Sequence, residues 1–279
     1  MPDIAFVNDA FMPLSEAHVS VEDRGFQFGD GVYELLRVYA GVPYRPAEHF
    51  ARLDRSAAAL GIPLPYTREQ WAALVSEAVT RSGHPAAKVY IQVTRGVSPR
   101  DHVVSGPLKP TVVLTVRALV PPGAAFYAGG ASVVTVPDIR WTRCDIKSVC
   151  LLANVLAKQQ ARDAGAFEAL FVRDGCVLEG TTSNVMVVQG ATLVTPPEGP
   201  WLLSGVTRQV VLALAQAAGI PVKEQRVTEA DLFAADEVFL TGTTIEVLPV
   251  VRVNGRRIGT GTTGRVTGLL MSRFGDSHA

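Results

Sequence analysis

The sequence predicts a two-domain α+β protein, in which a small α+β N-terminal domain precedes a larger pseudo-barrel α/β domain. A chain of 279 residues has room for about two domains of ordinary size. Short strand-like segments outnumber helical ones and do not alternate strictly with them, which argues against a parallel βαβ fold. A Pro/Gly-rich stretch near mid-chain predicts a linker at 119–126, between domains at 1–118 and 127–279.

The first half is predicted to combine hairpins with helices. β-branched and aromatic runs joined by Gly turns are typical of strands, and a Pro or a capping residue before a helical apolar repeat is typical of helices. Thr67 and Gln70 have the spacing of a capping box, and Gly83 is a stop signal. The predicted elements are strands at 32–39, 42–45, 89–94 and 111–116, and helices at 46–60 and 68–82.

The second half is predicted to be richer in short strands. Asp174-Gly175 and Asn254-Gly255 are turn signals that join neighbouring segments, and the second is a strong hairpin signal. Glycines follow two helical repeats, and a flexible turn at 259–264 precedes a last helix. The predicted strands are 132–136, 168–172, 177–178, 183–188, 192–194, 237–241 and 247–251, and the helices are 149–164 and 207–218.

Charge and cysteine content exclude several classes of protein. Lys plus Arg and Asp plus Glu number 26 each, so no net charge draws the chain to nucleic acid or an anionic membrane. The 3 cysteines cannot all pair with one another, which fits a reducing compartment. The first residues have no leader pattern, and no apolar run could span a membrane. We expect a cytoplasmic protein without nucleic-acid or membrane partners.

The usual motifs of several enzyme classes are missing. The chain has no Walker-type phosphate loop, no His-Glu-x-x-His pair and no Gly-x-Ser-x-Gly elbow, and we expect no metal site. Residues 259–264 match the dinucleotide-binding spacing, but the fifteen residues after them are too few for that fold. Lysines are scarce, and Lys147 lies between a polar run and an apolar helix start. Position alone does not distinguish it from a surface lysine.

Motifs in several segments, read together, point to one family. The segment Asp138–Ser148, which contains Lys147, resembles the lysine segment of class IV aminotransferases, the fold type IV enzymes that use pyridoxal 5'-phosphate. The resemblance covers almost the whole chain and is closest to the D-amino acid transaminase branch. The other segments that carry it, in chain order, are Arg24–Glu34, His49–Leu53, Gln92–His102, Glu179–Val185, Ser204–Arg208 and Thr241–Thr244.

The resemblance implies a pyridoxal phosphate site. Lys147 would hold the cofactor as a Schiff base and move a proton between the substrate and the cofactor. Glu179 would pair with the pyridine nitrogen, so that the ring can act as an electron sink. Members of the branch carry Ser where this chain has Gly242, which removes one hydroxyl. The residues implied to bind the phosphate are Arg52, Gly205, Val206, Thr207, Gly242 and Thr243.

The resemblance also implies a substrate. Tyr33, Arg100 and His102 would hold the substrate carboxylate, with Arg100 and His102 supplied by the partner in a homodimer with composite sites. Asp101 stands where a small residue is expected. The implied reaction is a ping-pong transamination of D-alanine and 2-oxoglutarate to pyruvate and D-glutamate.

Alternatives within the fold remain open. They are a branched-chain L-amino acid aminotransferase, an (R)-amine transaminase and an aminodeoxychorismate lyase, all of which keep the lysine and the glutamate. A different class of alternative is a dimer that carries the cofactor without turnover.

Overall fold

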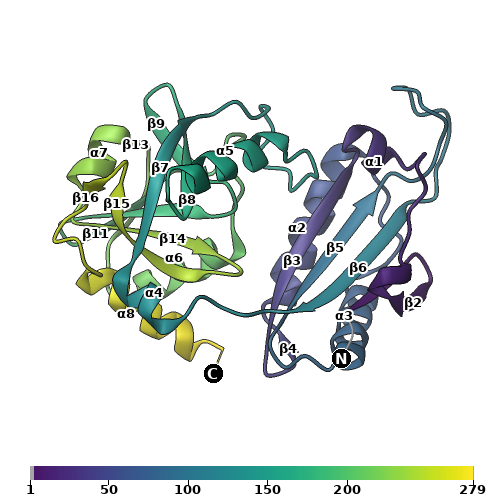
Figure 1. Ribbon diagram of the computed structural model, residues 1–279, viewed down its shortest axis with the longest axis horizontal. Coiled ribbons are helices and arrows are strands. Elements are labelled where there is room, and N and C mark those ends of the chain that lie inside the picture. Colours follow the sequence, from purple (N-terminus) through teal and green to yellow (C-terminus); the bar gives the residue numbers. More distant parts are fainter. Residues whose placement is uncertain (1–2, 279) are drawn as a thin grey trace. The chain divides into compact units, whose positions relative to one another are not determined.

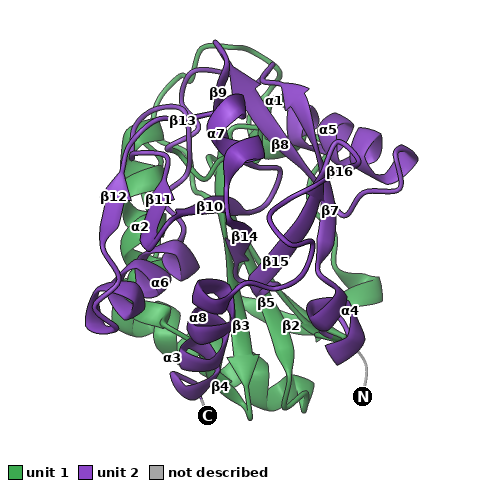
Figure 2. Cartoon of the chain, turned by 90° about the vertical axis from the view of Figure 1, so that its left-hand side faces the viewer, with its two compact units in different colours: residues 1–120, 146–150 green, residues 121–145, 151–279 purple. Residues whose placement is uncertain are grey.

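The computed structural model describes residues 3–278, which form two compact units (Figure 2). Unit 1 extends to Val120 and also contains Ile146–Cys150, and unit 2 contains Pro121–Asp145 and the chain from Leu151 onward. The change from unit 1 to unit 2 after Val120 falls inside the expected linker at 119–126. The inclusion of 146–150 in unit 1 has no counterpart in the sequence analysis. The expectation about the leader involves Met1 and Pro2, which lie outside the described residues.

Unit 1 is an antiparallel sheet with two long helices packed against it (Figure 1). The strands pair in the order β2-β1-β6-β5-β3-β4. Trp71, Leu53 and Leu36 are fully buried in the apolar core of this unit. Its elements are β1 Ile4–Val7, β2 Ala10–Pro13, η1 Leu14–Glu16, α1 Arg24–Phe28, β3 Gly31–Tyr39, β4 Val42–Pro43, α2 Pro46–Leu60, α3 Arg68–Ser82, β5 Ala87–Thr94 and β6 Thr111–Ala118.

The two long helices of unit 1 have the predicted bounds and caps. Pro46 begins α2, and Gly61 ends it in the left-handed region at φ 62°. Thr67 accepts the backbone N–H of Gln70, and the Gln70 side chain accepts the N–H of Thr67, so the capping box is formed. These local signals lie within a few residues of the helix ends, which is why the sequence alone could reveal them.

Unit 2 is built on a closed ring of six strands. β10, β14, β15, β7, β8 and β9 pair in turn, and Asn184 of β10 pairs with Glu179 of β9 to close the ring. Apolar side chains from the ring strands, such as Val133, Leu170 and Leu240, fill its core. The predicted pseudo-barrel is therefore confirmed. The strands of this unit are β7 Ala131–Pro137, β8 Glu168–Arg173, β9 Cys176–Gly180, β10 Asn184–Gln189, β11 Thr192–Thr195, β12 Val222–Glu224, β13 Val227–Thr228, β14 Glu237–Gly242, β15 Glu246–Val253 and β16 Arg256–Arg257.

Five helices accompany this ring in the described residues of unit 2. Ala157 and Ala161 of α5 pack against β7 and β8, and α6 packs with α8 and β14. In the part of the chain that the structure describes, no helix has the length and apolar character needed to cross a membrane. The helices are α4 Ala124–Gly129, α5 Leu152–Asp163, α6 Val206–Ala217, α7 Glu229–Ala234 and α8 Arg265–Asp276.

The structure corrects the predicted start of one helix. The sequence predicts a helix over 149–164, but α5 begins at Leu152. The preceding residues pair with β3 instead: Ser148 forms a bridge with Val32, and the Val149 N–H donates to the Gly31 carbonyl at 3.1 Å. The Ser148 bridge and the Val149 hydrogen bond keep these two residues out of the helix. The structure also contains short elements that were not predicted, namely β1, β2, η1, α1, α4, β12, β13 and α7, whereas β16 follows the predicted hairpin turn at Asn254-Gly255.

The capping box of α3 gives a direct test of helix stability. Replacing Thr67 with Ala should lower the free energy of unfolding by about 1 kcal/mol, because the N–H of Gln70 loses its acceptor. Urea unfolding followed by circular dichroism measures the change. The control is Thr67→Ser, which keeps the hydroxyl and should retain most of the stability. Equal losses in both variants would contradict a capping role.

Candidate active site

Lys147 is held against β3 by its own main chain. Its carbonyl accepts the Tyr33 N–H at 2.9 Å, and its N–H donates to Ser56 Oγ of α2 at 3.1 Å. The side chain is half-buried, with Nζ 4.4 Å from the centre of the Tyr33 ring. The N–H and the carbonyl of Lys147 are both hydrogen-bonded, so its backbone is fixed. The side-chain amine therefore extends from a fixed position over the face of an aromatic ring.

Tyr33 belongs to a small aromatic group on β3 and β5. Its ring centre lies 5.6 Å from that of Tyr90, and the Tyr90 hydroxyl donates to Gln92 Oε1 at 2.7 Å. Burial, together with the neighbouring Tyr33, raises the pKa of Tyr90 to about 12. The Tyr90 phenol therefore stays protonated over the physiological pH range.

Glu34, the next residue on β3, is the centre of a buried charged cluster with α2. The side chains of Arg52 and His49 lie three residues apart on α2 and both reach the fully buried Glu34 carboxylate. Arg52 donates from Nε to Oε1 at 2.7 Å and from Nη2 to Oε2 at 2.9 Å, and His49 Nδ1 lies 2.7 Å from Oε2. The paired contacts fix the plane of the Arg52 guanidinium.

The charges in this cluster follow from its burial and its pairing. Burial alone would raise the pKa of Glu34, but the charge and hydrogen bonds of Arg52, with help from His49, hold it well below its usual range. Burial lowers the pKa of His49, against the opposing effect of Glu34. The cluster therefore contains an ionised Glu34 next to a charged Arg52.

Glu179 is fixed in unit 2 by several hydrogen bonds. Its Oε2 accepts the Leu203 N–H at 3.0 Å and Asn184 Nδ2 at 3.2 Å, and its Oε1 pairs closely with Arg140. Arg140 also donates to Asp138 Oδ1 at 2.9 Å. Burial lowers the pKa of Arg140, but the Asp138 hydrogen bond and the charge of Glu179 outweigh this effect and raise it. The carboxylate of Glu179 thus has a fixed orientation, set by two hydrogen bonds and one ion pair.

Asn184 lies at the junction of the second-half motifs. The sheet register pairs it with Glu179 on one side and with Thr241 on the other, and its Nδ2 also donates to the Leu203 carbonyl at 2.9 Å. A Cβ added to Gly205 would lie 2.2 Å from Asn184 Oδ1, so only glycine fits there. Segments separated by many residues in the sequence therefore meet around one side chain.

The two turns predicted to bind phosphate lie at the ends of regular elements in unit 2. Gly205 is the N-cap of the 12-residue helix α6 and has no side chain to satisfy the first N–H groups, which belong to Val206 and Thr207. Gly242 ends β14 and is followed by Thr243. Thr241 Oγ1 is buried and has no hydrogen-bond partner among residues 3–278. These free donors have the chemistry that an anion needs.

Arg100 and His102 lie in the exposed loop after β5. Within residues 3–278, no hydrogen bond, ion pair or ring contact joins either side chain to Tyr33. The loop is instead anchored on α1, through contacts of Arg24 and Phe28. Tyr33, the third residue predicted to bind the substrate carboxylate, contacts Lys147 instead.

Sequence analysis missed several residues that orient the candidate site. Glu34, His49 and Ser56 are inside or next to the quoted motifs, and the helical spacing of 49, 52 and 56 was the available signal. Asn184 and Arg140 could not be assigned, because their partners lie far away in the sequence. Among the described residues, no group of three or more His, Cys, Asp or Glu side chains is placed to hold a metal ion.

Comparisons with known proteins identify the family. The chain matches the family described as amino-transferase class IV over residues 31–253. It is 44% identical to the D-alanine aminotransferase of Bacillus licheniformis over 260 residues, covering 93% of this chain and 92% of the relative. The chain belongs to the class IV aminotransferase family and is therefore an aminotransferase.

Solved structures share the fold. The T.th. branched-chain amino acid aminotransferase with pyridoxamine 5'-phosphate has a TM-score of 0.90 and 29% identity, covering 98% of this chain and 93% of that one. The branched-chain amino acid aminotransferase of Escherichia coli has a TM-score of 0.90 and 25% identity, covering 100% and 95%. The two-domain fold type IV architecture expected from the sequence is confirmed.

The buried cluster predicts an acid-sensitive stability. Replacing Glu34 with Gln should lower the free energy of unfolding at pH 7 by about 3 kcal/mol, because Arg52 loses its countercharge. Below pH 4.5, the usual pKa of glutamate, the unfolded wild-type chain binds a proton that the folded chain does not. The advantage of wild type over the variant should therefore shrink as the pH falls.

Urea unfolding at pH 7 and at several values below 4.5 measures this advantage. The control is Glu77→Gln, which removes an exposed carboxylate paired with Arg81 on α3 and should change stability by less than about 1 kcal/mol. A difference between wild type and Glu34→Gln that stays constant down to low pH would show that Glu34 is not ionised in the folded protein.

Proposed function

We propose that this chain catalyses pyridoxal phosphate-dependent transamination of D-amino acids, with D-alanine as donor and 2-oxoglutarate as acceptor. The observation that carries the proposal is the fixed Lys147 amine over Tyr33, in a chain 44% identical to a D-alanine aminotransferase. The reaction would be a two-stage exchange, in which the amino group of the donor would be carried by the cofactor until the acceptor enters. Its products are pyruvate and D-glutamate.

The residues of the chain fit pyridoxal phosphate by their chemistry. When bound, the cofactor supplies an aldehyde that reacts with amines and a ring that withdraws electrons from the substrate Cα. Lys147 offers the amine, and Glu179 offers an oriented carboxylate for the pyridine nitrogen. The N–H groups at the start of α6 have no side-chain cap, which leaves donors for a phosphate. A solved relative of the same fold holds pyridoxamine 5'-phosphate.

Lys147 is proposed as the catalytic residue. Its Nζ would hold the cofactor covalently, and as a free amine it would take the proton from the substrate Cα. Its carbonyl bond to Tyr33 and its N–H bond to Ser56 keep the free amine in place. A tethered base needs no bimolecular encounter with the proton that it removes.

Glu179 is proposed to keep a proton on the pyridine nitrogen. Its hydrogen bonds to the Leu203 N–H and to Asn184 orient the carboxylate, and Arg140 forms an ion pair with it. An ionised carboxylate favours the charged form of a basic nitrogen next to it.

The phosphate is proposed to bind Arg52 and two glycine turns. The ion pair with Glu34 fixes the guanidinium plane of Arg52. Gly205 and Gly242 allow a close approach of the backbone, and their turns supply the N–H groups of Val206, Thr207 and Thr243. With Gly in place of Ser, position 242 contributes only its backbone.

The substrate carboxylate is proposed to bind Tyr33 together with Arg100 and His102 of a second subunit. This assignment requires a homodimer. The exposed face of α5 supports it, because Leu152, Val155 and Leu156 are 73%, 60% and 50% exposed at helical spacing. A cytoplasmic location is part of the proposal, supported by the free thiols of the three cysteines.

A branched-chain L-amino acid aminotransferase is the second candidate. The solved structures reported above are branched-chain enzymes with TM-scores of 0.90, although their identity to this chain is lower than that of the D-alanine aminotransferase. Both reactions use the lysine and the glutamate in the same way. A panel of D- and L-amino acids with 2-oxoglutarate distinguishes the two, since only one enantiomer should react rapidly.

The lysine assignment has a spectroscopic test. Purified protein loaded with pyridoxal phosphate should show a visible absorption band that changes with D-alanine and not with L-alanine or L-leucine. Borohydride reduction and peptide mapping should find the label on Lys147. Replacing Lys147 with Ala should abolish both the label and turnover, a loss of at least about 1000-fold. Lys109→Ala removes an exposed lysine and should change neither, whereas a label on another lysine would overturn the assignment.

The carboxylate assignment predicts a change in substrate binding. Replacing Arg100 with Ala should raise the KM for D-alanine by about tenfold or more, because a charged hydrogen bond to the carboxylate is lost. Cofactor retention should be unchanged. The control is Arg117→Ala, which removes an exposed arginine at the end of β6. Wild-type KM in the Arg100 variant would remove this residue from the substrate site.

A further inference from the structure

The short helix α1 lies beneath the loop that carries Arg100 and His102. Asp23 caps the helix by accepting the Gly25 N–H at 2.8 Å, and its other oxygen accepts the Thr94 hydroxyl at 2.8 Å. A Cβ on Gly25 would lie 2.2 Å from Thr94 Cγ2, so the helix packs closely on the end of β5. The helix therefore has a fixed position relative to the loop that follows β5.

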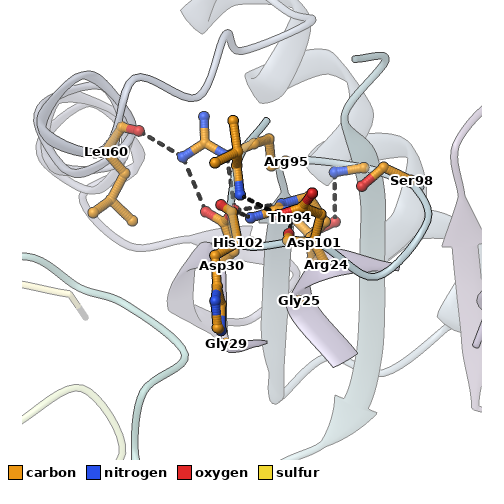
Figure 3. Close-up of polar contacts among 12 residues, drawn as sticks. Arg24, Gly25, Gly29, Asp30, Leu60, Thr94, Arg95, Ser98, Asp101 and His102 are labelled. Atoms are coloured by element: carbon orange, nitrogen blue, oxygen red, sulfur yellow. Dashed lines mark hydrogen bonds and ion pairs between the residues drawn. The ribbon is translucent and has the colours of Figure 1, made fainter. Parts of the chain in front are cut away.

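Arg24 joins this helix to the loop backbone (Figure 3). Its buried guanidinium donates from Nη1 to the Asp101 carbonyl at 2.6 Å and from Nη2 to the His102 carbonyl at 3.3 Å. Its Nε donates to Asp30 Oδ2 at 2.8 Å. One side chain thus holds two consecutive carbonyls of an otherwise exposed segment.

Phe28 contacts both side chains that are proposed to bind the substrate carboxylate. Its ring centre lies 4.8 Å from Cζ of Arg100 and 5.4 Å from the His102 ring. Cζ of Arg24 lies 4.9 Å from the same ring centre. A guanidinium that lies over an aromatic ring uses its flat face for the contact. Its N–H groups lie in the guanidinium plane and can still donate to a ligand.

The charge of Arg24 near Arg100 is partly offset by Asp30, which accepts a hydrogen bond from Arg24 Nε. Asp30 also pairs with Arg95, through Oδ2 at 2.8 Å and Oδ1 at 3.0 Å. Burial alone would raise the pKa of Asp30, but its bonds to Arg95 and Arg24 lower it, so the carboxylate remains ionised. Arg95 itself donates to the carbonyls of Leu60 and Gly61, at the end of α2.

We propose that Arg24 and Phe28 are positioning residues for substrate specificity: Arg24 fixes the backbone of the carboxylate-binding loop, and Phe28 orients Arg100 and His102 on its ring. This inference rests on the proposed function. It deepens that function by naming what orders the loop, which is contact with α1 and not contact with a substrate. The loop is ordered before any substrate arrives, which reduces the entropy lost on binding.

Hydrogen–deuterium exchange of the protein without substrate tests the positioning directly. Residues 98–103 contain reporter amides, since the Ser98 N–H donates to the Glu22 carbonyl and the Val103 N–H to Asp101 Oδ1. Arg24→Lys keeps the charge beside Asp30 but cannot hold two carbonyls with a fork, so exchange over 98–103 should be about tenfold faster. Phe28→Leu keeps apolar volume without the aromatic face and should give a smaller increase.

Matched controls exist for both variants. Arg95→Lys changes the other arginine on Asp30, which contacts the end of α2 and not the loop carbonyls. Phe26→Leu changes a 72% exposed ring on the same helix. Both controls should leave exchange over 98–103 within about twofold of wild type, a change too small to reflect a lost hydrogen bond.

Steady-state kinetics of the loaded enzyme provides the second measurement. Arg24→Lys and Phe28→Leu should raise the KM for D-alanine by about tenfold and leave kcat within about twofold, because only carboxylate binding is affected. A general loss of structure would lower kcat or cofactor retention instead.

Faster exchange in both test variants together with the raised KM supports the proposal. Unchanged exchange, equal exchange in the controls, or a wild-type KM would overturn it. If the wild-type enzyme does not use D-alanine, the proposed function fails. The exchange measurement still decides the positioning role, since it needs no substrate.

Discussion

The pairing of residues 146–149 with the start of β3 is the interaction on which the candidate site depends. Hydrogen bonds from Tyr33 to the Lys147 carbonyl and from Val149 to Gly31 make this short segment part of unit 1. The chain on both sides of the segment belongs to unit 2. Without these bonds the Lys147 amine would belong to a segment without fixed backbone contacts. Fixing its position would then cost more conformational entropy.

The buried charge of Glu34, also on β3, likewise fixes the position of a side chain in the candidate site. A fully buried Glu34 would be unfavourable by itself, and it is retained with Arg52 and His49 in close contact. Such clusters contribute little net stability compared with an apolar core, but they define the orientation of a guanidinium. The proposed phosphate-binding role of Arg52 would benefit from this orientation, because the guanidinium is in place before the anion arrives.

The fold of unit 2 brings together motifs that are far apart in the sequence. Closure of the strand ring places Glu179 opposite Asn184, and the next pairing places Asn184 opposite Thr241. Gly205 then packs against the Asn184 side chain. A closed ring fixes register on both sides of each strand, so the carboxylate and the two turns have one relative arrangement. In unit 1, helix α1 fixes the loop that contains Arg100 through one buried arginine, Arg24.

The sequence by itself determined the family and the helices with strong caps, and it nominated the residues of the candidate site. Those features depend on local signals such as the capping box at Thr67, or on motifs such as the segment around Lys147. Only the tertiary structure decided that α5 starts at Leu152, that Glu34 pairs with Arg52, and that Arg24 supports the loop at 101–102. These contacts join residues far apart along the chain, and one sequence contains no signal for which distant partner a side chain meets. Long-range pairing also outweighs local helix preference at Val149, which bonds to Gly31 instead of starting the predicted helix.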